Sequence, residues 1–566
     1  MSADSVIFEN AKNVPDIGVS SATISSSNPL WTALMGLAII SILFEIWLRS
    51  TREYKLTAKM PTPPRLPILG HAHRALYLSN AEIMAQAKKY IHTPGAVIRA
   101  FLGPIVVVGL WNPIDIEIVL SSSTHLEKSY EYKYFKPWFG DGLLISKGHH
   151  WQHHRRMIAP TFHQSILKSF IPTFVKHSKS VVQRMALEAG KEFDAHKYMS
   201  QVTVEILLST VMGVKKLPEP NKCLEYANAV LDMCDIIHKR QLKFYYRLDA
   251  TFRFSSLHDK ARRMLNTILN MTRQVVEERQ KNFSADSRAI FENEAEAAKR
   301  KRENVRAEGL RDDLDDIDED DVDEFEEGAK KRLALLDAMM EMSRNLEIEW
   351  TEKDIIDEVN TIMFEGHDTT SAASSFVLCI LGIYQDMQEK VLAEQRAIFG
   401  DDLMRDCTFA DTLEMKYLER VIMETLRLYP PVPLIARRAE HDIKLASGPY
   451  SIPKGTTIVI IQYAVHRDPK SFPNPEKFDP DNFLPERMAK RHYYSFIPFS
   501  AGPRSCVGRK FAILKLKVLL STILRNFVVK CNQQEKDFRM QGDIILKMEK
   551  GFNIMLEPRA EAKKVI

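Results

Sequence analysis

The chain has 566 residues, of which 45% are hydrophobic and 27% charged, and this balance excludes collagen-like and disulfide-dense classes. Its six cysteines are scattered without a C-x-x-C pair, which argues against a zinc ribbon, a thioredoxin-like site or a secreted disulfide framework. The net charge of the chain is +4. An acidic run at 312–327 contains twelve acidic residues and no basic residue, and without this run the 78 basic and 62 acidic residues give the chain a net charge of +16. Since no nucleic-acid motif accompanies this charge, we expect anionic lipid or an acidic protein as partner and no nucleic acid.

An apolar segment near the N-terminus predicts a membrane anchor. Residues 30–48, LWTALMGLAIISILFEIWL, carry one charge, at Glu45, and as a helix they would span about 28 Å, close to one hydrocarbon core. A secretory signal and a buried core helix are the alternatives, but the preceding residues lack a basic n-region. Basic residues follow the span from Arg49 to Lys59. The positive-inside rule therefore predicts a luminal tail at 1–29 and a cytoplasmic location for the rest.

The segment after the anchor changes composition twice. Residues 49–70 are basic and proline-rich, and the run PTPPRLP at 61–67 predicts a stiff, extended hinge. The globular domain is then expected at 71–566, with mostly helical periodicity and short strands such as 96–100 and 457–461. A charged segment at about 285–328, which ends in the acidic run, cannot bury much apolar surface. It is predicted to be a solvated or disordered insertion between helices.

A long helix is predicted after this insertion. Thr351 and Asp354 have the spacing of a capping box, with Trp350 in the staple position before them. Apolar residues then recur at helical spacing as far as Leu381, which predicts about thirty residues of helix. The middle of this helix reads FEGHDTT at 364–370, although glycine costs about 1 kcal/mol in a helix interior. Small and polar residues at this point suggest that something large passes close by.

A lone thiol lies further on, in the glycine-punctuated turn FSAGPRSCVG at 499–508. A buried structural cysteine needs no surrounding glycines, and a disulfide would need a partner. The turn matches the F-x-x-G-x-R-x-C-x-G signature of cytochromes P450, and FEGHDTT resembles their oxygen-activating helix. ETLR at 424–427 matches their E-x-x-R, and WQHHR at 151–155 matches their W-x-x-x-R. Glu365 in FEGHDTT, together with HRDP at 466–469, resembles family 4 and its insect branch.

The resemblance implies a mainly α fold with small β-sheets and haem b between the mid-chain helix and the cysteine turn. Cys506 is implied as the thiolate ligand of the haem iron, where it donates electron density that favours O–O cleavage. Phe499 is implied to pack beneath the sulfur. We expect Gly502 and Gly508 to allow a close backbone approach where a Cβ would collide. A buried free cysteine in a turn is the alternative.

Four further residues are implied to hold the haem propionates. Arg504 lies two residues before the cysteine, and guanidinium groups fit carboxylates in a bidentate manner. Trp151 and Arg155, one helical turn apart, resemble the pair that engages a propionate from the other side, and Arg437 matches a further donor. For each arginine the alternative is a solvated surface side chain.

The E-x-x-R pair has a structural role by resemblance. Glu424 and Arg427 share one helix face and are implied to lock the core beneath the haem together with a third arginine. Here that arginine is replaced by Asn482, which puts the third arm in doubt. Arg487 is a candidate substitute.

Three residues of the mid-chain motif carry chemistry by resemblance. Asp368 and Thr369 resemble the acid–alcohol pair that supplies protons during oxygen activation, and a helix kink is the alternative. Glu365 occupies the position where family 4 glutamates can form an ester with a haem methyl group. A protonated or hydrogen-bonded Glu365 is the alternative, because buried carboxylates are costly unless neutralised or paired.

Four histidines raise a separate metal hypothesis. His149, His150, His153 and His154 include pairs three and four residues apart, as in a zinc site on one helical face. No third ligand is suggested nearby in the sequence, and the same turn already carries two implied haem residues. The metal hypothesis is therefore not favoured, and Cys506 is the one predicted metal ligand.

The resemblance implies an NADPH-dependent monooxygenase that acts on a small lipophilic substrate at the endoplasmic reticulum membrane. No G-x-G-x-x-G motif within a βαβ pattern is visible, so electrons must come from a partner. By resemblance that partner is NADPH–cytochrome P450 reductase, with cytochrome b5 as a second candidate. Family 4 implies ω-hydroxylation of fatty acids or related chains, and the insect branch suggests hormone or insecticide metabolism. Residues 432–434 are candidate pocket residues.

Two other functions compete with this one. A haem-thiolate enzyme that rearranges peroxides would need no external electrons, and a non-catalytic protein would bind haem or lipid without turnover. The Asp368–Thr369 pair counts against both.

Overall fold

The computed structural model describes residues 29–90, 96–282, 334–344 and 350–561. The charged segment expected at about 285–328 lies outside the described residues, as does nearly all of the predicted tail at 1–29. The chain divides into a small unit, 1–51, and a large unit, 52–566.

The small unit contains helix α1 (Pro29–Ser50). Residues 30–50 have a mean hydropathy of 1.9, and none of the most apolar window is buried within the protein. By length and composition, α1 is the one helix of the described chain that could cross a membrane. It coincides with the predicted anchor segment.

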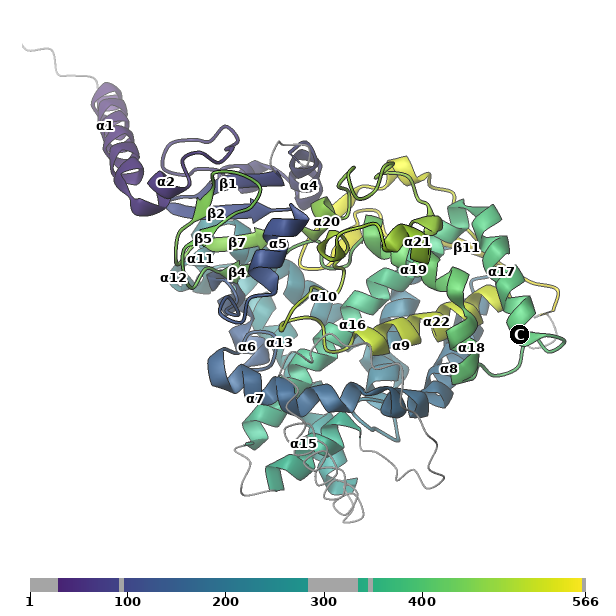
Figure 1. The fold of residues 1–566 in the computed structure, drawn as a ribbon. Helices are drawn as coiled ribbons and strands as arrows, with labels where there is room; N and C mark the ends of the chain where they lie inside the picture. The colour runs from purple at the N-terminus through teal and green to yellow at the C-terminus, as the bar shows by residue number, and fades with distance from the viewer. Residues whose placement is uncertain (1–28, 91–95, 283–333, 345–349, 562–566) are drawn as a thin grey trace, which may run out of the picture. The chain divides into compact units, whose positions relative to one another are not determined.

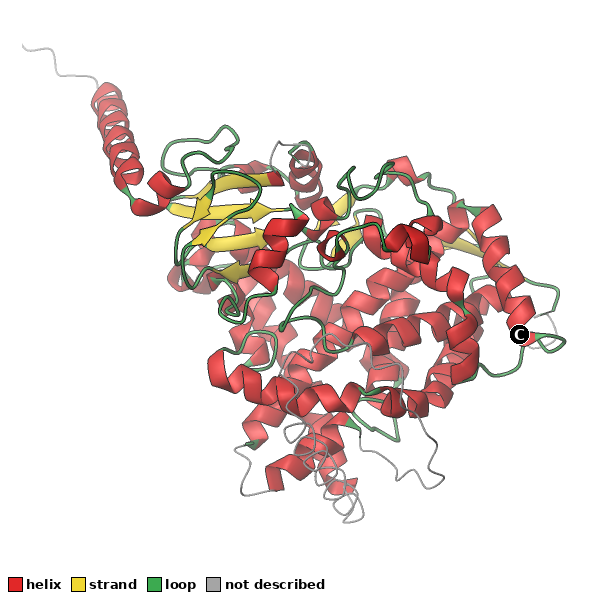
Figure 2. Cartoon of the chain, in the orientation of Figure 1, coloured by secondary structure: helices red, strands yellow, loops and turns green. Residues whose placement is uncertain are grey.

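The large unit is mainly helical (Figures 1 and 2). Its α-helices are α2 (Arg52–Leu56), α3 (Arg74–Tyr77), α4 (Asn80–Lys88), α5 (Pro113–Leu120), α6 (Lys136–Phe139), α7 (Gly148–Ile158), α8 (Gln164–Ala186), α9 (Ala195–Ser209), α10 (Pro220–Leu242), α11 (Phe244–Arg247), α12 (Asp249–Arg253), α13 (Ser256–Asn282), α15 (Leu335–Arg344), α16 (Glu352–Ile383), α17 (Gln385–Phe399), α18 (Phe409–Glu414), α19 (Lys416–Leu428), α20 (Gln462–Val465), α21 (Pro485–Met488) and α22 (Arg509–Asn526). Short 3-10 helices are η2 (Tyr130–Phe135), η3 (Ala159–Phe162), η4 (Pro480–Phe483), η5 (Tyr493–Ser495) and η6 (Glu535–Asp537).

Small sheets complete this unit. The largest has the order β1 (Val97–Leu102), β2 (Ile105–Leu110), β7 (Thr457–Ile460) and β4 (Ile435–Arg438). In it β2 and β7 are parallel, and the other neighbouring pairs are antiparallel. The others are β3 (Glu192–Asp194), β11 (Asn553–Pro558) and β8 (Phe527–Lys530); β9 (Met540–Gly542) with β10 (Leu546–Met548); and β5 (Ile443–Lys444) with β6 (Ser451–Ile452). The predicted mainly α fold with small sheets is confirmed, and both predicted strands form in the largest sheet.

Helix α16 is the central helix of the unit (Figure 1) and positions the site. It begins at the predicted capping box, in which Thr351 and Asp354 each satisfy a backbone N–H of the other. It continues for 32 residues and packs against α9, α13, α19 and α22. Its apolar side chains form the middle of the larger hydrophobic core, while a second core joins α5 to the four-stranded sheet.

A contact with a neighbouring helix accounts for the glycine in the middle of α16. A Cβ on Gly366 would lie 2.7 Å from a methyl carbon of Leu207 on α9. The helix is continuous through this point. Gly366 therefore allows α9 to pack closely against α16, and its small size is explained by this helix contact.

The proline-rich segment, predicted as a stiff, extended hinge, has contacts with the largest sheet. The Pro61 carbonyl accepts a hydrogen bond of 2.8 Å from the Arg99 N–H on β1. The Arg99 side chain donates to Thr62 Oγ1 at 2.9 Å, and the Arg65 guanidinium lies 4.5 Å from the centre of the Phe101 ring. Residues 61–67 thus lie against the first strand of the sheet and are part of the large unit.

Candidate active site

The cysteine turn lies between η5 and α22 and is closed by its own backbone. The Cys506 N–H donates to the Phe499 carbonyl at 2.9 Å, and the Ser505 N–H donates to the Gly502 carbonyl at 2.8 Å. Gly502 has a φ of +68°, and a Cβ there would lie 2.0 Å from the Leu120 carbonyl oxygen. A side chain at Gly502 is therefore excluded by both backbone conformation and space.

The expected collision at Gly508 is not found. Its φ is −92°, and a Cβ at this position would come no closer than 4.0 Å to any described protein atom outside its own surroundings. Gly508 instead ends the turn as the N-cap of α22.

The Cys506 thiol lines an interior space. Its surface is exposed, yet burial, followed by the nearby Glu365 carboxylate, raises the pKa of the thiol to about 11. A hydrogen bond from the Gly508 N–H acts in the opposite direction. A thiolate at this position therefore needs a cation, and a coordinated metal ion deprotonates a cysteine outright.

Helix α16 presents a partly exposed stripe within its otherwise buried middle. Glu365, Gly366 and Thr369 retain some surface, while residues 359–364 are buried. Thr369 Oγ1 donates a hydrogen bond of 2.6 Å to the Glu365 carbonyl. Burial raises the pKa of Glu365 to about 7, although Lys128 acts against this shift. The Glu365 carboxylate is close enough to Cys506 to raise the pKa of the thiol, so this stripe lies near the space that the thiol lines.

Three buried cations gather near this space: Lys128, Arg437 and Arg504, each less than 10% exposed. Burial and then Arg437 lower the pKa of Lys128 far below its ordinary value. Burial and then Arg437 likewise lower the pKa of Arg504 to about 9. Such a cluster is costly unless anions accompany it. Lys128 precedes η2 and was not singled out in the sequence, because no motif marks a single lysine in a loop.

The residues present fit a group that carries two carboxylates. Arg437 Nη2 and Arg504 Nε are buried without a hydrogen-bond partner in the described structure. Arg504 is held by the Leu143 carbonyl at 3.1 Å and the Ser146 carbonyl at 2.5 Å, and its guanidinium lies 4.2 Å from the centre of the Trp151 ring. The structure thus brings Trp151, Arg437 and Arg504 together. Arg155, also on α7, is half-buried and interacts electrostatically with Cys506 and Glu365.

The predicted acid of the site is fully buried. Asp368 has no exposed surface, and neither carboxylate oxygen has a hydrogen-bond partner among the described residues. Lys547, on β10, approaches it with Nζ at 3.6 Å from Oδ2. Burial lowers the pKa of the neighbouring His196 and His367 to about 3, so these histidines are neutral at physiological pH. Lys547 therefore supplies the local positive charge.

The E-x-x-R pair forms a buried ion pair that Asn482 joins. Arg427 donates to both carboxylate oxygens of Glu424 at 2.7 Å, and both side chains are fully buried. Glu424 also accepts hydrogen bonds from the Asp479 N–H at 2.8 Å and from Asn482 Nδ2 at 3.1 Å. Arg487 pairs with Asp479 at 3.1 Å, so it does not substitute as a partner of Glu424.

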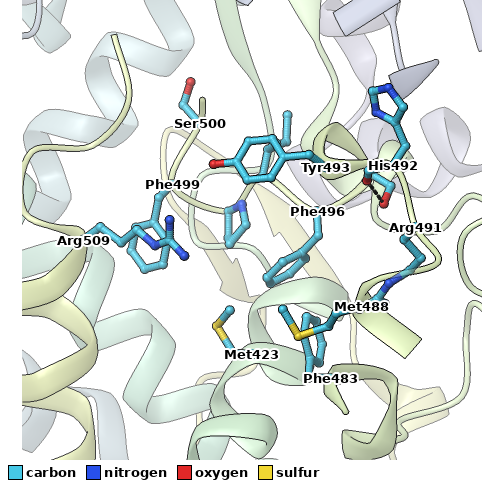
Figure 3. Close-up of a pocket in the computed structure, with 13 residues that line it drawn as sticks. Met423, Phe483, Met488, Arg491, His492, Tyr493, Phe496, Phe499, Ser500 and Arg509 are labelled. Atoms are coloured by element: carbon cyan, nitrogen blue, oxygen red, sulfur yellow. Dashed lines mark hydrogen bonds between the residues drawn. The ribbon is translucent and has the colours of Figure 1, made fainter. Parts of the chain in front are cut away.

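Phe499 begins the cysteine turn and is partly buried. Together with Met423, Phe496 and Arg509 it lines a cavity of about 130 Å³ (Figure 3). Cys506 is not among the residues that line this cavity.

Comparison with known proteins agrees with this geometry. Residues 60–556 match the family described as cytochrome P450. Cytochrome P450 4g1 of Drosophila melanogaster is 65% identical over 543 residues, which cover 96% of this chain and 97% of that protein. Cytochrome P450 4V2 of Homo sapiens is 34% identical over 546 residues, which cover 94% and 96%. The crystal structure of the cytochrome P450DA heme domain superposes with a TM-score of 0.68, covers 89% of this chain and 99% of that chain, and is 18% identical, so it shows the fold alone.

Proposed function

The chain belongs to the cytochrome P450 family, with insect-type family 4 relatives, and we propose that it oxidises long apolar chains at their terminal carbon, as in the ω-hydroxylation of a fatty acid. Members of this family are haem-thiolate monooxygenases. When bound, the haem supplies the activation of dioxygen. The remaining chemistry belongs to the side chains described above.

We assign the cofactor-holding role to two groups of residues. Cys506 is the iron ligand, because its sulfur faces the interior space and the Gly508 N–H favours the thiolate. Arg437 and Arg504 are the propionate donors, since each keeps a buried nitrogen without a partner in the described structure. Lys128 joins them through its position in the same cation cluster. Trp151 and Arg155 bound this region from α7.

Proton supply is assigned to Asp368 and Thr369. Lys547 is the cationic partner of the fully buried Asp368 carboxylate, with Nζ 3.6 Å from Oδ2. Thr369 lies on the partly exposed stripe, where its hydroxyl can exchange the Glu365 carbonyl for a water molecule. The pair thus joins a buried acid to the space where oxygen is used.

The position of Glu365 is the observation that supports selectivity for the terminal carbon. Its carboxyl group lies on the stripe that faces Cys506 and has a pKa of about 7. Next to it, Phe364 packs among Phe135, Trp138 and Phe139, with ring centres 5.1–6.4 Å apart. Glu365 would be the side chain that forms an ester with a haem methyl, and the two electrons and two protons released would pass to the dioxygen that the monooxygenase reaction reduces to water. A tethered cofactor, held on a helix that this buried aromatic cluster fixes in place, would favour attack at the end of a chain.

The proposal also includes the source of the electrons and the location of the protein. The electrons come from NADPH through NADPH–cytochrome P450 reductase, with cytochrome b5 as a second donor. Helix α1 anchors the protein in the endoplasmic reticulum membrane, and the large unit lies on its cytoplasmic side. The length and hydropathy of α1 support the anchor, and the basic residues that follow it support the orientation.

Turnover of saturated fatty acids of several lengths tests this function. The purified protein with reductase and NADPH should give terminal products for at least one chain length, and the E365A variant should shift oxidation toward internal carbons. Products at internal carbons alone, in the unsubstituted protein, would contradict terminal selectivity but not monooxygenation. Turnover of a peroxide without NADPH would favour the rearrangement alternative.

A further inference from the structure

Helix α7 carries four histidines that the haem site does not use. His150 and His154 are four residues apart on this helix, and their ring centres lie 3.9 Å apart. The start of α16 brings Asp354 to the same place, so that one potential ligand atom from each of the three residues lies within 4.8 Å of the others. The third ligand that the local sequence lacks therefore comes from a residue 200 positions further along the chain.

His154 is held in the orientation of a metal ligand. Its Nδ1 lies 2.7 Å from Oε1 of Glu358, whose other oxygen accepts the Leu143 N–H at 3.0 Å. In the tautomer whose Nδ1–H donates to Glu358, Nε2 keeps its lone pair, as in zinc-bound histidines. His154 is 1% exposed, and Nε2 has no hydrogen-bond partner in the described structure. The Trp350 ring covers the imidazole, with ring centres 4.1 Å apart.

His150 and Asp354 each have a donor atom left for an ion. His150 Nε2 lies 3.1 Å from the Asp141 carbonyl, to which it donates, and this leaves the Nδ1 lone pair. The hydrogen bonds recorded for the Asp354 carboxylate come from Thr351 and fall on Oδ2, which leaves Oδ1. Both residues are only partly buried, so their side chains can rotate.

We propose that His150, His154 and Asp354 form a binding site for a divalent transition-metal ion of the kind that prefers imidazole, such as Zn²⁺. Zinc–ligand bonds of about 2.0–2.2 Å place tetrahedral ligand atoms roughly 3.4 Å apart. The 4.8 Å cluster reaches this spacing by rotation of His150 and Asp354 toward the fixed His154. The ion satisfies the buried Nε2 and joins α7 to the first turn of α16.

Zinc titration of the full-length, haem-containing protein without a histidine tag tests this site. After chelator treatment, calorimetry and metal analysis should show one tightly bound Zn²⁺ per chain, and the ion should raise the midpoint of thermal unfolding. Mg²⁺ at the same concentration should do neither, since it prefers oxygen ligands.

Two alanine variants separate this site from general surface binding. H150A should bind Zn²⁺ at least tenfold more weakly, whereas H149A, which removes an exposed histidine outside the triad, should bind as the unsubstituted protein does. His150 is partly exposed, so H150A is expected to fold, and circular dichroism checks this. Absence of stoichiometric binding, or equal affinity in the two variants, would overturn the proposal.

Discussion

Lys547 Nζ lies 3.6 Å from Asp368 Oδ2, and this ion pair joins the hairpin of β9 and β10 to the middle of α16. Asp368 has no exposed surface, whereas the Lys547 side chain is 17% exposed. Lys547 is therefore the charged link between a buried acid and the outside of the protein. Nothing in the local sequence of the hairpin marks it, because the contact spans almost 180 residues.

Replacement of Lys547 by methionine should uncouple the reaction. The variant removes the cation that pairs with the buried Asp368 carboxylate, which has no hydrogen-bond partner in the described structure, and so it disturbs the proton relay that we assign to Asp368 and Thr369. We expect product formed per NADPH consumed to fall about tenfold, with a larger solvent isotope effect. K550M, at an exposed lysine of the same hairpin, is the control. Equal coupling in both variants would show that Lys547 has no part in proton supply.

The Glu424–Arg427 lock predicts a large loss of stability. E424A leaves a fully buried guanidinium without its carboxylate, and the free energy of unfolding should fall by about 3–5 kcal/mol. R487A removes a partly exposed pair with Asp479 and should cost less than about 1 kcal/mol. Chemical unfolding measures both values. A cost for R487A as large as that for E424A would mean that Arg487 belongs to the lock after all.

Alanine substitutions at Gly502 and Gly400 distinguish the cost of backbone strain from the cost of a steric collision. Both Gly502 and Gly400 have positive φ, but only at Gly502 would a Cβ meet another group, the Leu120 carbonyl oxygen at 2.0 Å. G400A should therefore cost about 1–2 kcal/mol. G502A should cost clearly more and should also reduce haem incorporation, because the cysteine turn must shift. Similar unfolding midpoints for the two variants would count against this account of the turn.

The proposed Glu365 ester predicts a cofactor that resists extraction. After turnover, acid and organic solvent should leave haem attached to part of the unsubstituted protein, whereas E365Q should release all of it. Mass spectrometry of the digested protein would locate the attached peptide. Complete release from the unsubstituted protein would leave Glu365 as a hydrogen-bonded acid.

The predictable features were local in sequence. The α16 capping box, the strands at 97–102 and 457–460 and the cysteine turn each depend on neighbouring residues, and the structure has all of them. Contacts between distant segments were beyond the sequence. Lys128 joins Arg437 and Arg504 only through the fold, and Gly366 is explained by Leu207 on another helix.

The proposed function depends on a bond between the Cys506 sulfur and the haem iron. Carbon monoxide added to the reduced full-length protein tests this bond directly, because the absorption spectrum of the adduct reports the ligand on the opposite side of the iron. We predict the long-wavelength band of a thiolate-ligated haem, which should be lost in C506A. The shorter-wavelength band of a histidine-ligated haem in the unsubstituted protein would contradict the account.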